Sequence, residues 1–236
     1  MAFPKVLVVF AHPDDAEYMC GGTVARWARE GSEVHYVVVT DGSAGSNEPG
    51  KTREELRVVR EREQRAAAQV LGVRTVSFLG ELDGMLEVTL GTRRKVTREV
   101  RRIRPDVIVA PDPSRLWSGS GYINHSDHKA AGELALSAVM PDAPTRLMFP
   151  ELLDEGFEPY EVPNLWLASN EPDTFVDISD TIDVKIKALA QHVSQGGADS
   201  EPWVRERAQQ VGGEGGHVYA EAFKAFRFVD EEQEDE

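Results

Sequence analysis

Short apolar runs alternate along the chain with longer segments whose apolar residues recur at helical spacing. Runs of about four to eight apolar residues are typical of buried strands, and apolar residues at i, i+3, i+4 and i+7 are typical of amphipathic helices. The runs that predict strands are 5–11, 34–40, 75–79 and 107–111, followed less regularly by 146–149, 165–168 and 174–177. The segments that predict helices are 17–31, 56–72, 96–103, 129–139 and 182–193, and Gly196-Gly197 and Gly212 to Gly216 punctuate two last helical segments.

This alternation predicts the fold class. Strands that alternate with helices at such spacing form parallel βαβ units. We therefore expect an α/β fold, a doubly wound, mostly parallel sheet with helices on both faces (Rossmann-like). At 236 residues and 41% hydrophobic content the chain can bury one sizeable core, so we expect a single domain over 1–229. Residues 230–236 form an acidic run that we expect to be disordered.

Charge and cysteine content narrow the partners and the compartment. The net charge of −15 disfavours a nucleic-acid partner, whose phosphates would be repelled. No apolar run approaches membrane-spanning length and no apolar leader precedes the first strand, so we expect no membrane partner and a cytoplasmic protein. The single Cys20 cannot form an internal disulfide, which agrees with a reducing compartment. A homo-oligomer is left open.

Two polar clusters stand where a predicted strand gives way to a predicted helix. His12-Pro13-Asp14-Asp15 follows the run 5–11, and His125-Ser126-Asp127-His128 lies between 107–111 and 129–139. In an open α/β sheet, ligands bind outside the carboxyl ends of the strands, which is where both clusters fall. Imidazole and carboxylate together suit a divalent metal such as zinc. We therefore expect one metal site built from both clusters, and we interpret the other three histidines, His35, His192 and His217, as structural.

At this point the residues resemble a known family, the zinc-dependent N-acetylglucosaminyl deacetylases of the PIG-L/LmbE type. That family includes deacetylases of the mycothiol and bacillithiol pathways and of glycosylphosphatidylinositol assembly. The resemblance runs from Lys5 to about Ala138. Its motifs are Ala11-His-Pro-Asp-Asp-Ala-Glu17, Gly21-Gly-Thr23, Thr40-Asp-Gly42, Arg60-x-x-Glu63 and His125-Ser-Asp-His128.

The resemblance implies a role for each residue of the two clusters. By that resemblance His12, Asp15 and His128 would bind the metal, and Asp14 would be the general base. His125 would face the substrate carbonyl, to stabilise the oxyanion or protonate the leaving amine, and Asp127 would support the histidines. Arg60 matches an arginine that contacts the substrate in the family, and we also assign Asn124 to substrate binding. Some members carry a tyrosine where this chain has Ile123.

The resemblance also implies the cofactor and the reaction. We expect Zn²⁺, with Fe²⁺ left open because two histidines and one aspartate with open positions suit both ions. The expected reaction is hydrolysis of the N-acetyl group of a small amino-sugar conjugate, with acetate and a free amine as products.

Two other classes of function remain as alternatives. Gly45-Ser-Asn-Glu-Pro-Gly50-Lys51-Thr52 matches the phosphate-loop pattern G-x-x-x-x-G-K-[ST] of nucleotide phosphohydrolases. Against it, Pro49 lacks the N–H that such a loop aims at phosphate, and Glu48 adds a negative charge. The third hypothesis is a non-catalytic metal-dependent binding module. Against that, three ligands leave a position for water, whereas structural zinc sites are usually closed by four.

Overall fold

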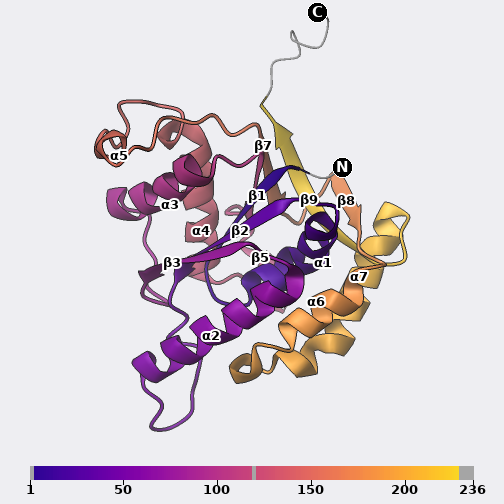
Figure 1. Ribbon diagram of the computed structural model, residues 1–236. Coiled ribbons are helices and arrows are strands. Elements are labelled where there is room, and N and C mark those ends of the chain that lie inside the picture. Colours follow the sequence, from indigo (N-terminus) through magenta and orange to yellow (C-terminus); the bar gives the residue numbers. More distant parts are fainter. Residues whose placement is uncertain (1–2, 119–120, 229–236) are drawn as a thin grey trace, which may run out of the picture.

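The computed structural model describes residues 3–118 and 121–228, and within them a seven-stranded sheet has the order β3-β2-β1-β4-β7-β9-β8 (Figure 1). Strands β1, β2, β3, β4 and β7 run parallel, whereas β9 is antiparallel to both β7 and β8. The predicted fold class is therefore confirmed. The acidic run 230–236 lies outside the described residues. The strands of this sheet are β1 (Lys5–Phe10), β2 (Glu33–Thr40), β3 (Thr75–Glu81), β4 (Val107–Pro111), β7 (Asn164–Ala168), β8 (Thr174–Asp177) and β9 (Ala220–Arg227).

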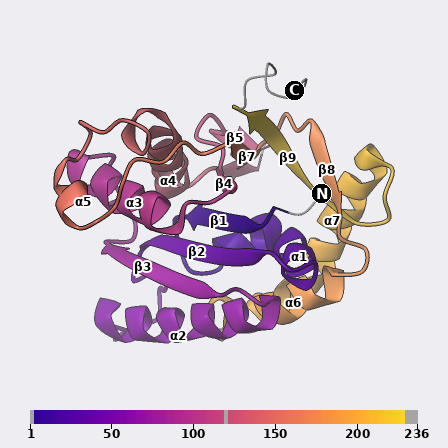
Figure 2. The ribbon, with the colours of Figure 1, turned by 45° about the horizontal axis from the view of Figure 1, so that its top comes forward.

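Helices cover both faces of the sheet (Figure 2). One face carries α1 (Asp15–Arg29), α2 (Arg53–Leu71), α6 (Ile182–Leu189) and α7 (Glu201–Gly215), and the other carries α3 (Leu90–Ile103) and α4 (Ser126–Ser137). The shorter elements are β5 (Trp117–Ser118), β6 (Tyr122–Ile123), the π-helical turn η1 (Ala138–Asp142), α5 (Glu151–Asp154), and the 3₁₀ turns η2 (Val193–Gln195) and η3 (Gly197–Ser200). Among the described residues, no helix is both long and apolar enough to cross a membrane.

The continuous apolar run of β1 reflects burial on both sides. Val6 and Val8 belong to the core under α1 and α2, whereas Leu7 and Val9 belong to the core under α3 and α4. Successive side chains of a strand point to opposite faces, so a central strand needs apolar residues at every position. This is why the first strand could be predicted from the sequence.

Helix α1 is kinked at Cys20, whose φ of −147° and ψ of 21° are not helical. The kink frees the backbone N–H groups of Gly22 and Thr23, which donate to the Glu221 carboxylate of β9 at 2.9 and 2.7 Å. A Cβ on Gly22 would lie 2.8 Å from Ile178, so this position has no room for a larger residue. The Gly21-Gly-Thr23 motif thus fits the close packing of α1, whose first turn carries Asp15.

Two sequence predictions of secondary structure are wrong. The segment 146–149, predicted as a strand, forms turns, with Leu147 85% exposed and Phe149 at a φ of 53°. Its path is set by the buried Arg101, whose guanidinium donates to the carbonyl oxygens of Thr145 and Met148. The segment after Gly216, predicted as a last helix, is strand β9, because it completes the sheet between β7 and β8.

Helix α4, which carries His128, packs closely on the end of β4, and this contact gives a stability prediction. A Cβ on Gly132 would collide with the carbonyl oxygen of Pro111. We expect Gly132→Ala to lower the free energy of unfolding by about 1–3 kcal/mol, the usual range for overpacking. The matched control is Gly213→Ala in α7, where no described atom lies within 4 Å of the Cβ position, and which should stabilise by about 0.5–1 kcal/mol. Urea unfolding measures both; equal midpoints for the two variants would contradict the prediction.

Candidate active site

The two predicted clusters meet at the carboxyl edge of the sheet, where the strand order reverses. His12 follows β1 and Asp15 begins α1, whereas His128 lies in the first turn of α4, after β4. Strands β1 and β4 are neighbours, but β1 leads towards β2 and β3 and β4 leads towards β7. Ligand sites of open α/β sheets occupy this switch point.

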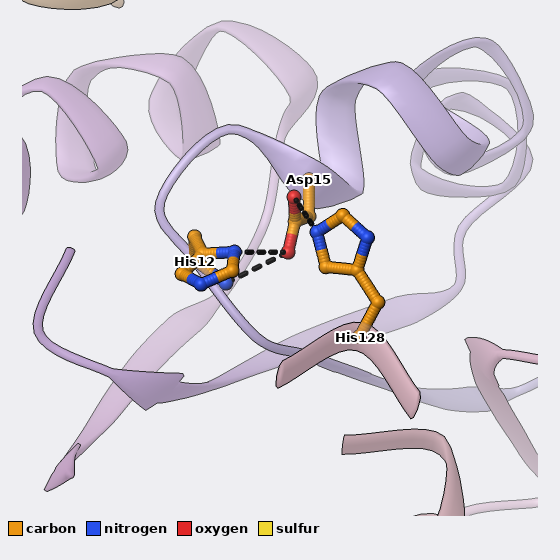
Figure 3. Close-up of side chains that lie close together, drawn as sticks. All are labelled: His12, Asp15 and His128. Carbon is orange, nitrogen blue, oxygen red and sulfur yellow. Dashed lines mark hydrogen bonds and ion pairs between the residues drawn. The ribbon is translucent and has the colours of Figure 1, made fainter. Parts of the chain in front are cut away.

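His12, Asp15 and His128 face one another (Figure 3), and their ligand atoms lie within 4.8 Å of each other. Asp15 Oδ2 is 3.4 Å from His12 Nδ1, and Asp15 Oδ1 is 3.1 Å from His128 Nε2. The backbone N–H of His12 also donates to Asp15 Oδ2 at 2.7 Å, which fixes the carboxylate in the turn. Two imidazoles and one carboxylate therefore converge on a single point.

The ring nitrogens that face away from this point are paired with oxygen atoms. His128 Nδ1 is 2.9 Å from Asn124 Oδ1, and His12 Nε2 is 3.2 Å from Asp127 Oδ2. Such partners orient a metal-binding histidine and leave its other nitrogen free for the ion. The buried Asn124 amide also donates to the Arg115 carbonyl oxygen at 2.7 Å. These contacts give Asn124 a role in orienting His128, and its predicted contact with substrate stays a prediction.

Asp127 is fully buried and supports His12 more than it supports His125. Its carboxylate accepts the backbone N–H groups of Gly84 at 2.8 Å and Leu86 at 3.3 Å, and lies 3.9 Å from His125 Nδ1. Burial raises its pKa, but the hydrogen bonds from His12 and from the Gly84 N–H outweigh burial and lower the pKa. Asp127 therefore remains a carboxylate that positions its neighbours and has no exposed surface for a substrate.

Asp83 also belongs to the site, although its role was not predicted from the sequence. Its Oδ1 lies 3.2 Å from His12 Nε2, and its Oδ2 accepts the backbone N–H of Ala44 at 2.9 Å. Burial raises the pKa of Asp83, but His12, the Ala44 N–H and Arg60 bring it down to about 2. The signal that could have found it is the Asp83-Gly84 turn, which follows the third predicted strand at the same edge of the sheet.

Asp14 stands beside the metal-binding set with its side chain turned to Arg60. The distance between Asp14 Oδ2 and Arg60 Nη2 is 3.2 Å. Burial raises the pKa of Asp14 most, Arg60 lowers it and Asp15 raises it, and the net result is a pKa of about 7. A carboxylate that exchanges protons near neutral pH suits general-base work.

Arg60 reaches this position from the middle of α2 and is itself buried. Its guanidinium donates to the carbonyl oxygens of Gly42, at 3.0 Å, and Pro13. The Cβ of any other residue at Gly42, whose φ is +66°, would lie 2.8 Å from the Pro13 ring and 3.0 Å from the guanidinium. Arg60 thus ties together the loops that follow β1 and β2. Its predicted contact with substrate stays a prediction.

His125 is the more open histidine, with 44% of its side chain exposed and its ring centroid 4.6 Å from that of His12. Its Nδ1 accepts the backbone N–H of Asp127 at 3.2 Å, so the neutral ring carries its proton on Nε2. Burial, together with His12 and His128, lowers the pKa of His125 against the opposing effect of Asp127. The ring is therefore a neutral Nε2–H donor at pH 7, a form suited to stabilising an oxyanion.

The charges of the site fit a bound divalent cation. The carboxylates of Asp15, Asp83 and Asp127 surround His12, and Asp14 lies close by, whereas Arg60 is the cation paired with this group. Burial would lower the pKa of His12, but Asp15, Asp127 and Asp83 raise it to about 12. A proton on His12 would therefore supply the positive charge that a bound metal ion would otherwise supply. The same donor set suits zinc and ferrous iron.

The phosphate-loop alternative is not supported by the backbone of 45–52. Several N–H groups that such a loop would aim at phosphate are already bonded: Glu48 N–H to Ser46 Oγ, Lys51 N–H to the Glu48 carbonyl and Thr52 N–H to Glu55 Oε2. The Lys51 ammonium lies 3.6 Å from the Glu48 carboxylate, which competes with any phosphate. The loop instead leads into the Thr52 cap of α2.

Single substitutions should identify which residues hold the ion. His12→Ala and His128→Ala remove donors of the His12–Asp15–His128 set, and two remaining ligands hold a divalent ion poorly. His125→Ala is the matched control, because His125 belongs to a second geometric grouping with His12 and Asp127. Elemental analysis after dialysis should show no metal in the first two variants and full metal in the third. Metal retained in His128→Ala and lost in His125→Ala would assign the ion to the second grouping.

Metal binding should also release protons. Because the neighbouring carboxylates raise the pKa of His12 to about 12, the metal-free imidazole is protonated at pH 7 and must lose a proton to ligate. We expect release of about one proton per ion and an apparent affinity that rises with pH. Titration calorimetry in buffers of different ionisation enthalpy measures the number. A value of zero at pH 7 would mean that His12 is neutral in the metal-free protein.

Known proteins resemble this chain in both sequence and fold. The chain is 33% identical to a diacetylchitobiose deacetylase of Thermococcus kodakarensis over 93% of its own length and 82% of that protein. It superposes with a TM-score of 0.87 on the N,N'-diacetylchitobiose deacetylase of Pyrococcus horikoshii, 31% identical, covering 95% of this chain and 84% of that one. A third likeness is GalB, a 4-carboxy-2-hydroxymuconate hydratase of Pseudomonas putida, with a TM-score of 0.79, 25% identity, and coverage of 98% and 99%. The fold alone therefore does not decide the reaction.

A family model decides the membership of the chain. Residues 7–139, more than half of the sequence, match the PIG-L model, which is described as GlcNAc-PI de-N-acetylase. The matched span contains His12, Asp14, Asp15, Arg60 and the second cluster up to His128. The chain therefore belongs to the PIG-L family, as its motifs predict.

Proposed function

We propose that the protein is a metal-dependent N-deacetylase that hydrolyses the N-acetyl group of an N-acetylglucosamine-type conjugate. The observation that carries this proposal is the convergence of three metal donors, His12, Asp15 and His128, with the Asp14 carboxylate directly beside them and held by Arg60. The proposal includes a single domain over 1–229 and a zinc or ferrous ion held by His12, Asp15 and His128. The relatives include a diacetylchitobiose deacetylase and a deacetylase of an inositol-linked acetamido sugar, and this supports N-acetylated amino sugars as the substrate class.

The residues of the site divide the work of amide hydrolysis. When bound, a divalent ion supplies Lewis-acid polarisation of the acetyl carbonyl and acidifies water. Asp14 takes the proton of the attacking water as its oxygen bonds to the carbonyl carbon, a step typically worth about 10²–10⁴ in rate. The Nε2–H of His125 donates to the oxygen that becomes negative. The C–N bond then breaks, and Asp14 returns the proton to the departing amine.

Arg60 and Asp127 act around this chemistry. The bonds of the buried Arg60 guanidinium to Pro13 and Gly42 hold the turn that carries Asp14, and the proposal keeps for this rigid fork of donors a contact with a sugar hydroxyl of the substrate. The Asp127 carboxylate contacts His12 Nε2, and this contact turns the Nδ1 edge of the imidazole ring towards Asp15. A non-catalytic metal-binding module has no need of a further carboxylate, Asp14, beside three metal donors, and this favours the enzyme.

The test is a screen for acetate release over four substrates: free N-acetylglucosamine, an inositol-linked conjugate, a malate-linked conjugate and diacetylchitobiose. A small conjugate should be cleaved faster than the free sugar, because binding energy from the remote group can be used at the reacting centre. Chelator should abolish release and added zinc should restore it. Nucleotide hydrolysis without acetate release would favour the phosphate-loop class, and metal binding without any turnover would favour the binding module.

Asp14→Asn separates catalysis from metal binding. The amide keeps the shape of the side chain but cannot take a proton, so we expect kcat to fall by about 10²–10⁴ while the metal content stays at the wild-type value. Asp173→Asn, on an exposed ion pair with Lys224, is the control and should leave both unchanged. Loss of metal in Asp14→Asn, with metal retained in Asp15→Asn, would show that the roles of the two aspartates are reversed.

A further inference from the structure

Asp14 has a backbone conformation that an L-residue rarely adopts. Its φ is 104° and its ψ is −26°, in the left-handed half of the map that glycine usually occupies. Its side chain makes no capping bond to α1. Strained conformations persist only when the surrounding structure holds them.

The backbone of Asp14 is held by Gln64 of α2. The Asp14 N–H donates to Gln64 Oε1 at 2.8 Å, and Gln64 Nε2 donates to both carboxylate oxygens of Glu17, at 3.0 and 3.2 Å. These two neighbours fix the orientation of the amide, because an N–H requires the oxygen and a carboxylate requires the NH₂ group. Gln64 is completely buried. It lies one helical turn from Arg60, so the same face of α2 holds both the backbone and the side chain of Asp14.

The series continues into the interior. Glu17, on the first turn of α1, is also completely buried, and its Oε2 is 3.2 Å from His192 Nε2. His192 is equally buried and follows α6. A buried carboxylate is costly unless it is hydrogen-bonded, so Gln64 and His192 both support Glu17. Because Gln64, Glu17 and His192 have no exposed surface, they do not contact a substrate directly.

We propose that Gln64 is a positioning residue for the general base, acting through a buried series that runs from the Asp14 N–H through Gln64 and Glu17 to His192. The inference rests on the proposed function, in which Asp14 is the base. Gln64 holds the left-handed turn, and the turn aims the Asp14 carboxylate beside the donors of His12 and Asp15. The role of His192 is then to keep Glu17 in place for Gln64.

The first variant removes both hydrogen bonds and keeps the volume of the side chain. We expect Gln64→Met to lower kcat by about 10- to 100-fold, the usual effect of losing a residue that orients a catalytic group, with KM and metal content close to wild type. Glu99→Gln is the control for disturbing a buried polar group. Glu99 is buried on α3, where it binds Ser77 and Arg102, and its loss should not change kcat.

The decisive experiment exchanges donor and acceptor. Gln64→Glu sets two buried carboxylates against each other with no donor between them, so it should lower kcat strongly. In Glu17→Gln the new amide oxygen can still accept from the Gln64 NH₂ group, so this variant should lower kcat less. The double variant Glu17→Gln/Gln64→Glu restores one carboxylate and one amide, with an acceptor for the Asp14 N–H and a carbonyl oxygen for His192. It should recover most of the lost kcat, a coupling that a double-mutant cycle measures. A double variant no better than the worse single variant would overturn the proposal, as would wild-type kcat in Gln64→Met.

A crystal structure of Gln64→Met tests the positioning role without relying on turnover. We expect the Asp14 carboxylate to shift and its φ to leave the left-handed region, while His12, Asp15 and His128 keep their places. An unchanged Asp14 would overturn the proposal even if the wild-type protein releases acetate. A shifted Asp14 in a protein whose wild type cleaves no acetylated sugar would instead overturn the proposed function and leave the positioning role intact.

Discussion

The concentration of negative charge around one buried imidazole is the constraint on which the site depends. Asp15, Asp83 and Asp127 all lie within 3.4 Å of a His12 ring nitrogen. Carboxylates this close repel one another unless donors and a cation compensate. The fold supplies part of the compensation as backbone N–H groups, from Ala44 to Asp83 and from Gly84 and Leu86 to Asp127. These carboxylates raise the pKa of His12 to about 12, so the site favours a further positive charge, which a divalent ion would supply.

Sheet topology explains why residues so distant in sequence share this charge. Strand β1 lies between β2 and β4, so the loops after these strands open at one edge and on either side of His12. The loop after β3 adds Asp83, and α2 sends Arg60 back across the loops after β1 and β2. The parallel strands therefore bring five chain segments together: the loops after β1, β2 and β3, the start of α4 and the middle of α2. No single segment contains a complete site.

The sequence allowed prediction of the features that are encoded locally. The central strands are continuous apolar runs because both faces are buried, and the two histidine clusters lie directly after such runs, so the fold class and the family are confirmed. Asp83 and Gln64 could not be predicted in the same way, because their roles depend on contacts with His12 and Asp14, tens of residues away. The error at 146–149 has the same origin, since Arg101 determines that path. The assignment of roles to the site residues and the single domain over 1–229 remain predictions.

Asp14 and Asp15 are adjacent residues of the same type, but their surroundings shift their pKa values in opposite directions. Burial would raise the pKa of both, but for Asp15 His128 and His12 outweigh burial and hold the pKa well below its usual range. For Asp14 the opposing effect of Arg60 is incomplete, and burial leaves the pKa at about 7. Pairs of titratable groups whose environments push their pKa values apart indicate which is ligand and which is base. The left-handed turn at Asp14 makes this separation possible, because it directs one carboxylate towards the two histidines and the other towards Arg60.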